Sequence, residues 1–394
     1  MTIDALTSFL AATPDERQLL APELVNGIGA DRLEGILART WQRVGSFESV
    51  AEARTGMQIV GARGRVPVLA YTRPDGTLSA LYISGQPVSA LERWTGGLAG
   101  PWVALTVWPL ALVSTAVSLW TAGTVSSWIS DAAVLGILLV LSRGFGAPAA
   151  SDFPRPLRWT LGLVAAAGLG SALRLAGLRA GSPDAWTLGS WAVVLMMLVT
   201  IVRARRHRLD TEVSTPLHLP VDAGTWEIGQ GGGHRLNHHI HVPEQRGAID
   251  LVKLHPTGTR ATGYGPQRDP AAYAAYGTPL FAPCAGTVLQ AVDAHEDQVP
   301  GRQRYAPATG NFVSIDTGRE RVLLAHLRPG SLRVRPGDRV EVGDLLGEVG
   351  NSGNSSEPHL HLQADRDGLG LQLRFVGVEG GLWRGRQLRS PAVG

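Results

Sequence analysis

Two histidines near the C-terminal end, His359 and His361, carry the clearest chemical signal in the sequence. Alternate side chains of a β-strand point to the same face, so both imidazoles are expected on one side of a strand. In that position they can serve a single metal centre, one as a ligand and one beside a metal-bound water. The polar, glycine-containing loop 350–358 directly before them favours a tight turn that leads into the strand.

Three further features supply polar groups that the same centre could use. His326 stands at the end of an apolar, strand-like run. Asp250 is an acid among apolar neighbours, where an ionised carboxylate is costly to bury unless it is paired or bound to a metal. Cys284 is the single cysteine, so a metal must be held by His, Asp or Glu rather than by several thiolates. Upstream of the acid lies a cluster of histidines, namely His238, His239 and His241.

Ordered blocks around these residues resemble peptidase family M23, the lysostaphin or LytM type. Residues 277–288 are similar to the family stretch G-T-P-V-x-A-x-x-x-G-x-V, and residues 334–347 resemble its glycine–aspartate turn. Residues 350–361 are close to the family signature G-N-T-G…P-H-L-H. The resemblance runs from Asn237 to Gln363 and implies a zinc peptidase domain. Short β-like runs between Gly and Pro turns indicate an all-β sandwich or barrel for the same region.

The resemblance also implies a role for each candidate residue. Zinc would be held by an upstream histidine, by Asp250 and by His361, which leaves one position open for water. His326 and His359 would be the catalytic pair beside that water, one orienting or deprotonating it and one stabilising the developing oxyanion. A neutral imidazole is suited to proton transfer near neutral pH.

The first zinc ligand departs from the usual family pattern. Arg246 stands four residues before Asp250, where the family has a histidine, and a guanidinium stays protonated and cannot bind zinc. The sequence resembles a variant subgroup in which a longer loop separates the histidine from the aspartate. We therefore predict His239 as the first ligand, with His238 and His241 as alternatives. Strand parity does not separate His239 from His241.

A second departure keeps another class of function open. Leu324 occupies the place two before His326 where many relatives carry tyrosine, so one donor to the transition state is missing. The alternative to a peptidase is a catalytically degenerate module that binds the wall or regulates other wall hydrolases. Loss of zinc from the purified domain would favour that alternative. A transporter or sensor is disfavoured because the apolar segments contain few ionisable groups.

Composition changes along the chain and divides it into regions. Residues 1–95 predict a small soluble α+β domain, with a helix over 31–44 and a hairpin over 68–83. Long apolar runs lie between 100 and 203. Nine of the eleven histidines fall between His234 and His361. A linker is therefore expected at 204–226 and the peptidase domain at 227–394.

The apolar region predicts about four transmembrane helices, or three. Residues 101–122 and 186–202 are long enough to cross a membrane, which takes about 20 residues. The runs at 132–142 and 159–173 are shorter or richer in Gly and Ala. The chain is thus expected to be a multi-pass protein of the bacterial cytoplasmic membrane.

Charge gives conflicting information on orientation and excludes one class of partner. The arginines gather at the ends of the spans nearest the soluble regions, which by the positive-inside tendency would place both soluble ends in the cytoplasm. A wall-cutting domain must face outward, and three spans would resolve the conflict.

The expected partners are peptidoglycan cross-link or stem peptides and membrane lipid. A net charge of +3 with 18% charged residues does not resemble a nucleic-acid binder.

Overall fold

The computed structural model describes residues 2–22, 24–25, 30–53, 56–72, 76–83, 99–141, 153–232, 237–263, 267–301 and 308–390. Its N-terminal region combines helices with a four-stranded antiparallel sheet in the order β1-β2-β3-β4. Buried Leu6, Phe9, Leu33, Leu37 and Ile59 join the two layers in one core. The elements are α1 (Thr2–Ala11), α2 (Pro14–Leu20), α4 (Ala30–Val44), β1 (Phe47–Ala53), β2 (Gly56–Gly61), β3 (Gly64–Thr72) and β4 (Leu78–Ile83).

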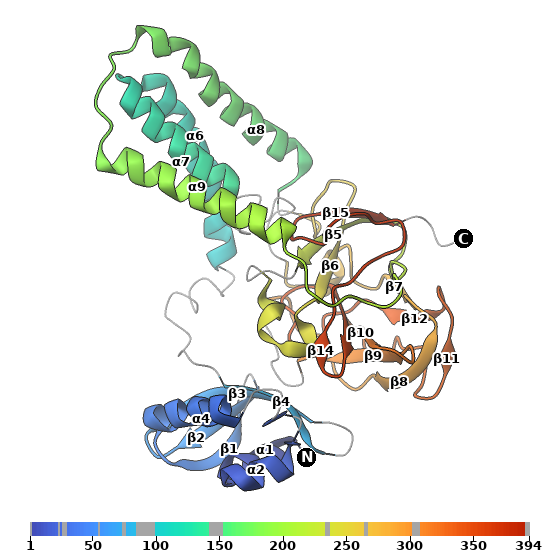
Figure 1. Cartoon of the computed structure of the whole chain (residues 1–394). Helices are drawn as coiled ribbons and strands as arrows, with labels where there is room; N and C mark the ends of the chain where they lie inside the picture. Colours follow the sequence, from blue (N-terminus) through green and yellow to red (C-terminus); the bar gives the residue numbers. More distant parts are fainter. Residues whose placement is uncertain are drawn as a thin grey trace.

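The apolar region forms helices that lie side by side (Figure 1). They are α6 (Ala99–Thr121), α7 (Val125–Val140), α8 (Arg155–Gly170) with its extension η3 (Ser171–Gly177), and α9 (Ala185–Arg206). Among the described residues, two helices are long and apolar enough to cross a membrane, Arg155–Gly177 and Ala185–Arg206. The other two offer shorter apolar stretches, Thr106–Thr121 and Val125–Val140. The structure therefore supplies two qualifying spans where about four were expected.

Small residues and tryptophan hydrogen bonds hold these helices together. A methyl group on Gly168 of α8 would lie 3.1 Å from Ala116 of α6, so a side chain here would press the two helices slightly apart. The indole N–H of Trp128 donates to Ser171 Oγ at 2.7 Å, and that of Trp191 donates to the carbonyl of Ile129 at 3.1 Å. Packing within the bundle thus uses close contacts and polar bonds, while many large apolar side chains face outward.

The expected β-rich C-terminal domain is confirmed, and its core is a nine-stranded sheet. The strands follow the order β11-β8-β9-β10-β13-β6-β5-β15, with β14 paired to β13, and β12 pairs with β7 in a second small sheet. Their bounds are β5 (Gly224–Gln230), β6 (Ile249–Leu254), β7 (Pro279–Phe281), β8 (Gly286–Val292), β9 (Asn311–Asp316), β10 (Arg321–Leu327), β11 (Arg339–Val340), β12 (Leu345–Glu348), β13 (Leu360–Arg366), β14 (Leu369–Gly370) and β15 (Gln387–Ser390).

Short 3₁₀ turns and an extended segment complete this domain. The turns are η4 (His238–His241), η5 (Pro243–Gln245) and η6 (Pro270–Ala272). Val213, Leu217 and Val221 lie in the segment expected to be a linker, yet all three are buried in the core of the domain. The backbone N–H of Leu217 also donates to the carbonyl of Arg374 at 2.8 Å. The packed domain therefore includes much of that segment.

The ends of α8 and α9 contact the C-terminal domain (Figure 1). Arg155 donates through its backbone N–H to Thr257 and through its guanidinium to the carbonyl of Pro256, at 3.0 and 2.7 Å. The guanidinium of Arg205 lies 5.7 Å from the centre of the Trp383 ring, in cation–π geometry. Arginines at this end of the helices therefore have partners within the protein.

Candidate active site

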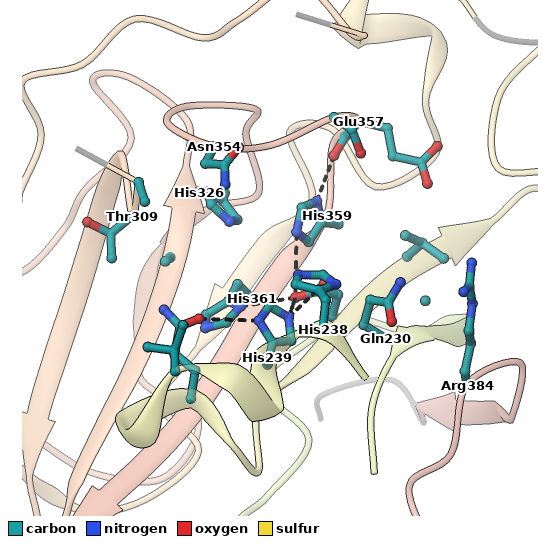
Figure 2. Close-up of a pocket in the computed structure, with 18 of the residues that line it drawn as sticks. Gln230, His238, His239, Thr309, His326, Asn354, Glu357, His359, His361 and Arg384 are labelled. Carbon is teal, nitrogen blue, oxygen red and sulfur yellow. Dashed lines mark hydrogen bonds and ion pairs between the residues drawn. The ribbon is translucent and has the colours of Figure 1, made fainter. Parts of the chain in front are cut away.

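Three adjacent strands of the sheet bring the sequence-predicted residues together. In the order β10-β13-β6, His361 is the cross-strand partner of both Asp250 on β6 and Ala325 on β10. Directly opposed residues on neighbouring strands have Cβ atoms about 5 Å apart. The side chains of His359 and His361 reach the same cavity, as their spacing predicts (Figure 2). Residues separated by more than a hundred positions thus meet because of sheet register.

Asp250 lies at the centre of the cluster. Its carboxylate is buried, and both of its oxygens are 3.0 Å from Nε2 of His239. His361 Nδ1 lies 3.0 Å from Oδ1 of the same carboxylate, and His359 Nε2 lies 3.6 Å from it. Burial by itself raises the pKa of Asp250, but the surrounding imidazoles outweigh it and hold this pKa well below the ordinary value. The carboxylate is therefore ionised.

His239 reaches this carboxylate from a 3₁₀ turn rather than from a strand. Asn237 caps the turn, its Oδ1 accepting from the N–H of His239 at 3.2 Å. The Asn237 amide also donates to the carbonyl of Ala248 at 3.1 Å, which ties the turn to the start of β6. Strand parity between His239 and His241 therefore does not apply, and the side chain of His241 lies outside the described residues.

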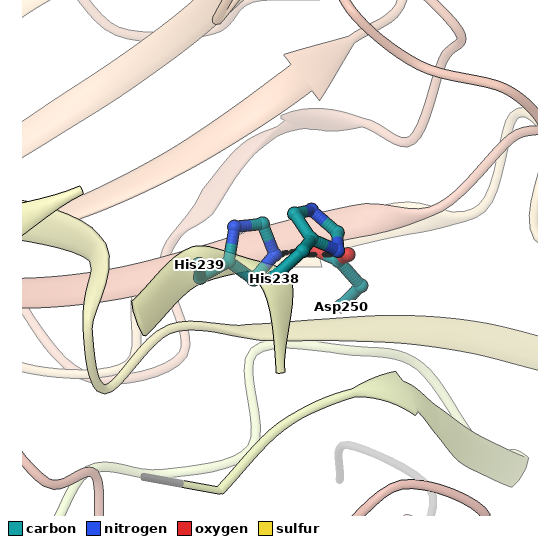
Figure 3. Close-up of side chains that lie close together, drawn as sticks. All are labelled: His238, His239 and Asp250. Carbon is teal, nitrogen blue, oxygen red and sulfur yellow. Dashed lines mark hydrogen bonds and ion pairs between the residues drawn. The ribbon is translucent and has the colours of Figure 1, made fainter. Parts of the chain in front are cut away.

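The neighbouring His238 gives a second possible set of metal ligands. Ligand atoms of His238, His239 and Asp250 lie within 4.8 Å of one another (Figure 3). His238 is exposed and stacks against His239 with ring centres 3.9 Å apart. His361 is buried on a central strand and only 3.0 Å from the shared carboxylate. Both sets share His239 and Asp250 and differ only in the third donor.

Two glutamine side chains contact the histidines that flank the Asp250 carboxylate. Gln363 Oε1 lies 3.0 Å from Nε2 of His361, and Gln245 Oε1 lies 3.3 Å from Nδ1 of His239. An amide oxygen can only accept, so each ring donates its far N–H to a glutamine, and when the ring is neutral its lone pair faces Asp250. Lone pairs and a carboxylate repel one another unless a cation lies between them. This set of two nitrogens and one carboxylate therefore fits a divalent metal such as zinc.

His326 is placed by a bulge at the end of β10. The pairing of β9 with β10 shifts between Ala325 and Leu327, and His326 adopts a left-handed backbone conformation with φ 67°. Such bulges re-aim a side chain and are frequent next to active sites. Its Nδ1 donates to the carbonyl of Ser352 at 2.8 Å. Burial, reinforced by the neighbouring histidines, holds the pKa of His326 well below its ordinary value, so the ring is neutral.

His359 faces the cavity beside His326, with ring centres 4.8 Å apart. Its Nδ1 lies 2.7 Å from the carbonyl of Glu357 and therefore donates to it, and Ser355 Oγ lies 3.0 Å from the same nitrogen. When neutral, both rings consequently present an unprotonated Nε2 on their other side. The pair can hold or accept a proton at these two nitrogens.

The cavity around these rings has a volume of about 320 Å³ and a lining that is part polar and part apolar (Figure 2). Arg260 crosses one wall and bonds to Glu357 at 2.7 Å and to Glu227 at 3.3 Å. Leu324 is fully buried in the hydrophobic core and offers no hydroxyl to the cavity. Further lining residues that sequence reasoning did not identify include Gln230, Thr309, Asn354 and Arg384.

One neighbour of the site that sequence reasoning missed, Gln363, could have been identified from strand periodicity. Gln363 follows His361 by two positions on the same strand, so it belongs to the face that carries both histidines. Gln245 offers no such signal, because it lies in a 3₁₀ turn whose position depends on the surrounding loop.

We expect Gln363→Leu to weaken zinc binding roughly 10- to 100-fold, as is usual when a group that orients a metal-binding histidine is lost. The reason is that His361 would lose the acceptor that fixes its tautomer. Competition with a chromogenic chelator measures the affinity of the full chain. Gln363→Glu keeps an acceptor oxygen and should retain binding. Equal affinity of Gln363→Leu and the parent chain would show that this contact does not orient the ring.

Comparison with known proteins finds a family match in the C-terminal part of the chain. Residues 271–372 match Peptidase family M23. Endolysin 2638A of Staphylococcus phage 2638A is 37% identical over 82 residues, a segment that covers 20% of this chain and 15% of the endolysin. The lysostaphin catalytic domain from Staphylococcus simulans matches 38% of this chain and 86% of its own, with 18% identity and a TM-score of 0.23. The catalytic domain of prophage-encoded EnpA from Enterococcus faecalis matches 41% and 92%, with 19% identity and a TM-score of 0.22.

The family match lies within the C-terminal domain, where the sequence blocks predict it. The matched segment contains His326, His359 and His361 but begins after His239 and Asp250. The pairing of β6 with β13 places Asp250 beside His361, and the turn η4 brings His239 to the same carboxylate.

Proposed function

We propose that this protein is a zinc metallopeptidase whose metal is held by His239, Asp250 and His361. The observation that carries the proposal is the convergence of Nε2 of His239 and Nδ1 of His361 on one buried carboxylate, each at 3.0 Å. A zinc ion with three protein ligands supplies a Lewis acid that lowers the pKa of water and polarises a carbonyl. His238 and His241 remain the alternatives for a ligand position.

His326 and His359 complete the proposed chemistry from the adjacent side of the cavity. With Nδ1 donating to a backbone carbonyl, each neutral ring offers Nε2 as a proton acceptor. One ring takes the proton from the attacking water and the other, once protonated, donates to the developing oxyanion. The geometry does not assign the two roles, because the rings are neighbours with the same kind of orienting bond.

The proposed substrate is a peptide of the bacterial wall, either a cross-link or a stem peptide, on which the M23 family acts. We further propose that the helical region anchors the enzyme in the cytoplasmic membrane. Support comes from the two qualifying spans and from large apolar side chains on their outer faces, since Leu173, Trp159 and Leu163 are 90%, 74% and 70% exposed. An anchor would hold the enzyme beside an immobile polymer.

The test uses the full chain purified in detergent. About one zinc per chain by elemental analysis, removed by a chelator and restored on re-addition, together with cleavage of peptidoglycan fragments, is the expected result. His218→Ala changes an exposed histidine that does not line the cavity, so this variant serves as the control and should keep its zinc. A chain that takes up no zinc on re-addition would overturn the proposal in favour of a degenerate module that binds the wall.

The proposed substrate requires the C-terminal domain to face outward. We expect a cysteine placed at exposed Glu341, in a Cys284→Ala background, to react in intact cells with a maleimide that cannot cross membranes. Burial raises the pKa of Cys284 to about 12, so the native thiol is a poor competitor even where it is retained. A second cysteine at Glu48 reports on the N-terminal region and separates an even from an odd number of spans. Labelling of position 341 only after lysis would exclude the wall as substrate.

A further inference from the structure

The last turns of α9 border a groove that the proposed peptidase chemistry does not use. The groove has a volume of about 660 Å³ and is apolar at one end and basic at the other. Leu198, Val199 and Val202 are 45%, 41% and 45% exposed along it. Its basic end is formed by Arg203, Arg206 and His207.

The basic end carries charge that the protein does not neutralise. Arg203 and Arg206 are exposed, three residues apart and therefore on one face of the helix. Within the part of the chain that the structure describes, neither forms an ion pair. Arg205 of the same turn points elsewhere and lies over the Trp383 ring. One turn of helix thus meets the C-terminal domain on one side and presents two free cations on another.

The position of these cations matches the depth of lipid headgroups. The apolar part of α9, residues 185–202, is about 27 Å long at 1.5 Å per residue, close to the roughly 30 Å hydrocarbon core of a bilayer. With that stretch embedded, Arg203 and Arg206 lie at the interface, where arginine side chains reach phosphate. A ligand that fills the whole groove must therefore combine an anionic head with an apolar tail.

We propose that this groove is a binding site for an anionic phospholipid. Its phosphate lies between Arg203 and Arg206, and an acyl chain runs along Leu198, Val199 and Val202. A free phosphate ion would use only the cations, and a neutral phospholipid would use mainly the apolar wall. The proposal rests on the membrane anchoring proposed above, but it does not depend on zinc or on peptidase activity.

The experiment measures lipid binding to the full chain, delipidated in a neutral detergent, by native mass spectrometry. We expect saturable binding of one phosphatidylglycerol, with phosphatidylcholine of the same acyl chains bound at least roughly tenfold more weakly. The double variant Arg203→Gln/Arg206→Gln should lose roughly 10- to 30-fold in affinity for phosphatidylglycerol. Arg205→Gln removes a charge from the same turn but outside the groove and should keep the preference.

Several outcomes would overturn the site. Equal binding of both lipids by the parent chain, or an unchanged preference in the double variant, would show that the two arginines do not select the headgroup. Glycerol phosphate binding as tightly as phosphatidylglycerol would show that the apolar wall plays no part. If the chain floats with vesicles of either lipid but fails these binding tests, only the proposed lipid site is overturned. A chain that stays in solution without detergent and does not float overturns the anchoring as well.

Discussion

Replacing Asp250 by asparagine should remove zinc binding while the C-terminal domain stays folded. The carboxylate is the one anionic group among the converging donors, and both of its oxygens face His239. An amide of the same shape lacks the charge that offsets the metal and turns an N–H toward the site. The loss should exceed the roughly 10- to 100-fold expected for a group that only orients a ligand.

Thermal unfolding distinguishes this loss from misfolding. A ligand that binds only the folded state raises stability by RT ln(1 + [L]/Kd), so zinc should raise the melting temperature of the parent chain. Asp250→Asn should show no rise on zinc addition, and its metal-free melting temperature should stay near that of the metal-free parent. His218→Ala should respond to zinc like the parent. A normal zinc response in Asp250→Asn would remove this residue from the metal site.

The parts of the site that the sequence predicts are those governed by strand periodicity. His359 and His361 share a face because they alternate on one strand, and Asp250 is identifiable as an acid in an apolar strand. Their meeting depends on the order β10-β13-β6, which no local pattern contains. His326 could not be aimed from periodicity, because a bulge and a positive φ redirect it.

The first ligand shows a different limit. The resemblance to a variant subgroup predicts His239 among the clustered histidines, and in the structure it reaches Asp250 from a 3₁₀ turn. Its position depends on Asn237, whose amide bonds to the carbonyls of Gly232 and Ala248. A capping interaction of this kind joins segments that sequence spacing treats as independent. Residue type and resemblance therefore select the candidate ligand, while its geometry depends on tertiary contacts.

The distribution of arginine has more than one cause. Arg155, Arg158 and Arg205 were counted as a topological signal, yet each contacts the C-terminal domain, Arg158 through the carbonyl of Gly258 at 3.4 Å. A charge retained for docking two parts of a protein carries less information about membrane orientation. The same reasoning applies to 204–226, where polar and Pro residues suggested a free linker but three apolar side chains are buried.

Replacing His326 or His359 by alanine should abolish most peptide cleavage while zinc binding is retained. Both rings lie beside the metal-binding cluster, and neither belongs to the proposed ligand set. Removing a group that transfers a proton in the transition state typically costs about 10²- to 10⁴-fold in rate. Hydrolysis of a peptidoglycan fragment, followed together with zinc content on the same samples, measures both quantities.

Both variants should lose catalytic rate, but they should differ in melting temperature. Alanine at 326 also occupies a left-handed backbone position, so His326→Ala should lower the melting temperature, whereas His326→Asn tolerates that conformation better. His359→Ala leaves Ser355 and the carbonyl of Glu357 without the imidazole N–H but has no such strain. Full zinc content with unchanged cleavage in both variants would show that proton transfer is carried by other groups. Because both rings are proposed to act together in the same transition state, the double variant should cost much less than the product of the two single losses.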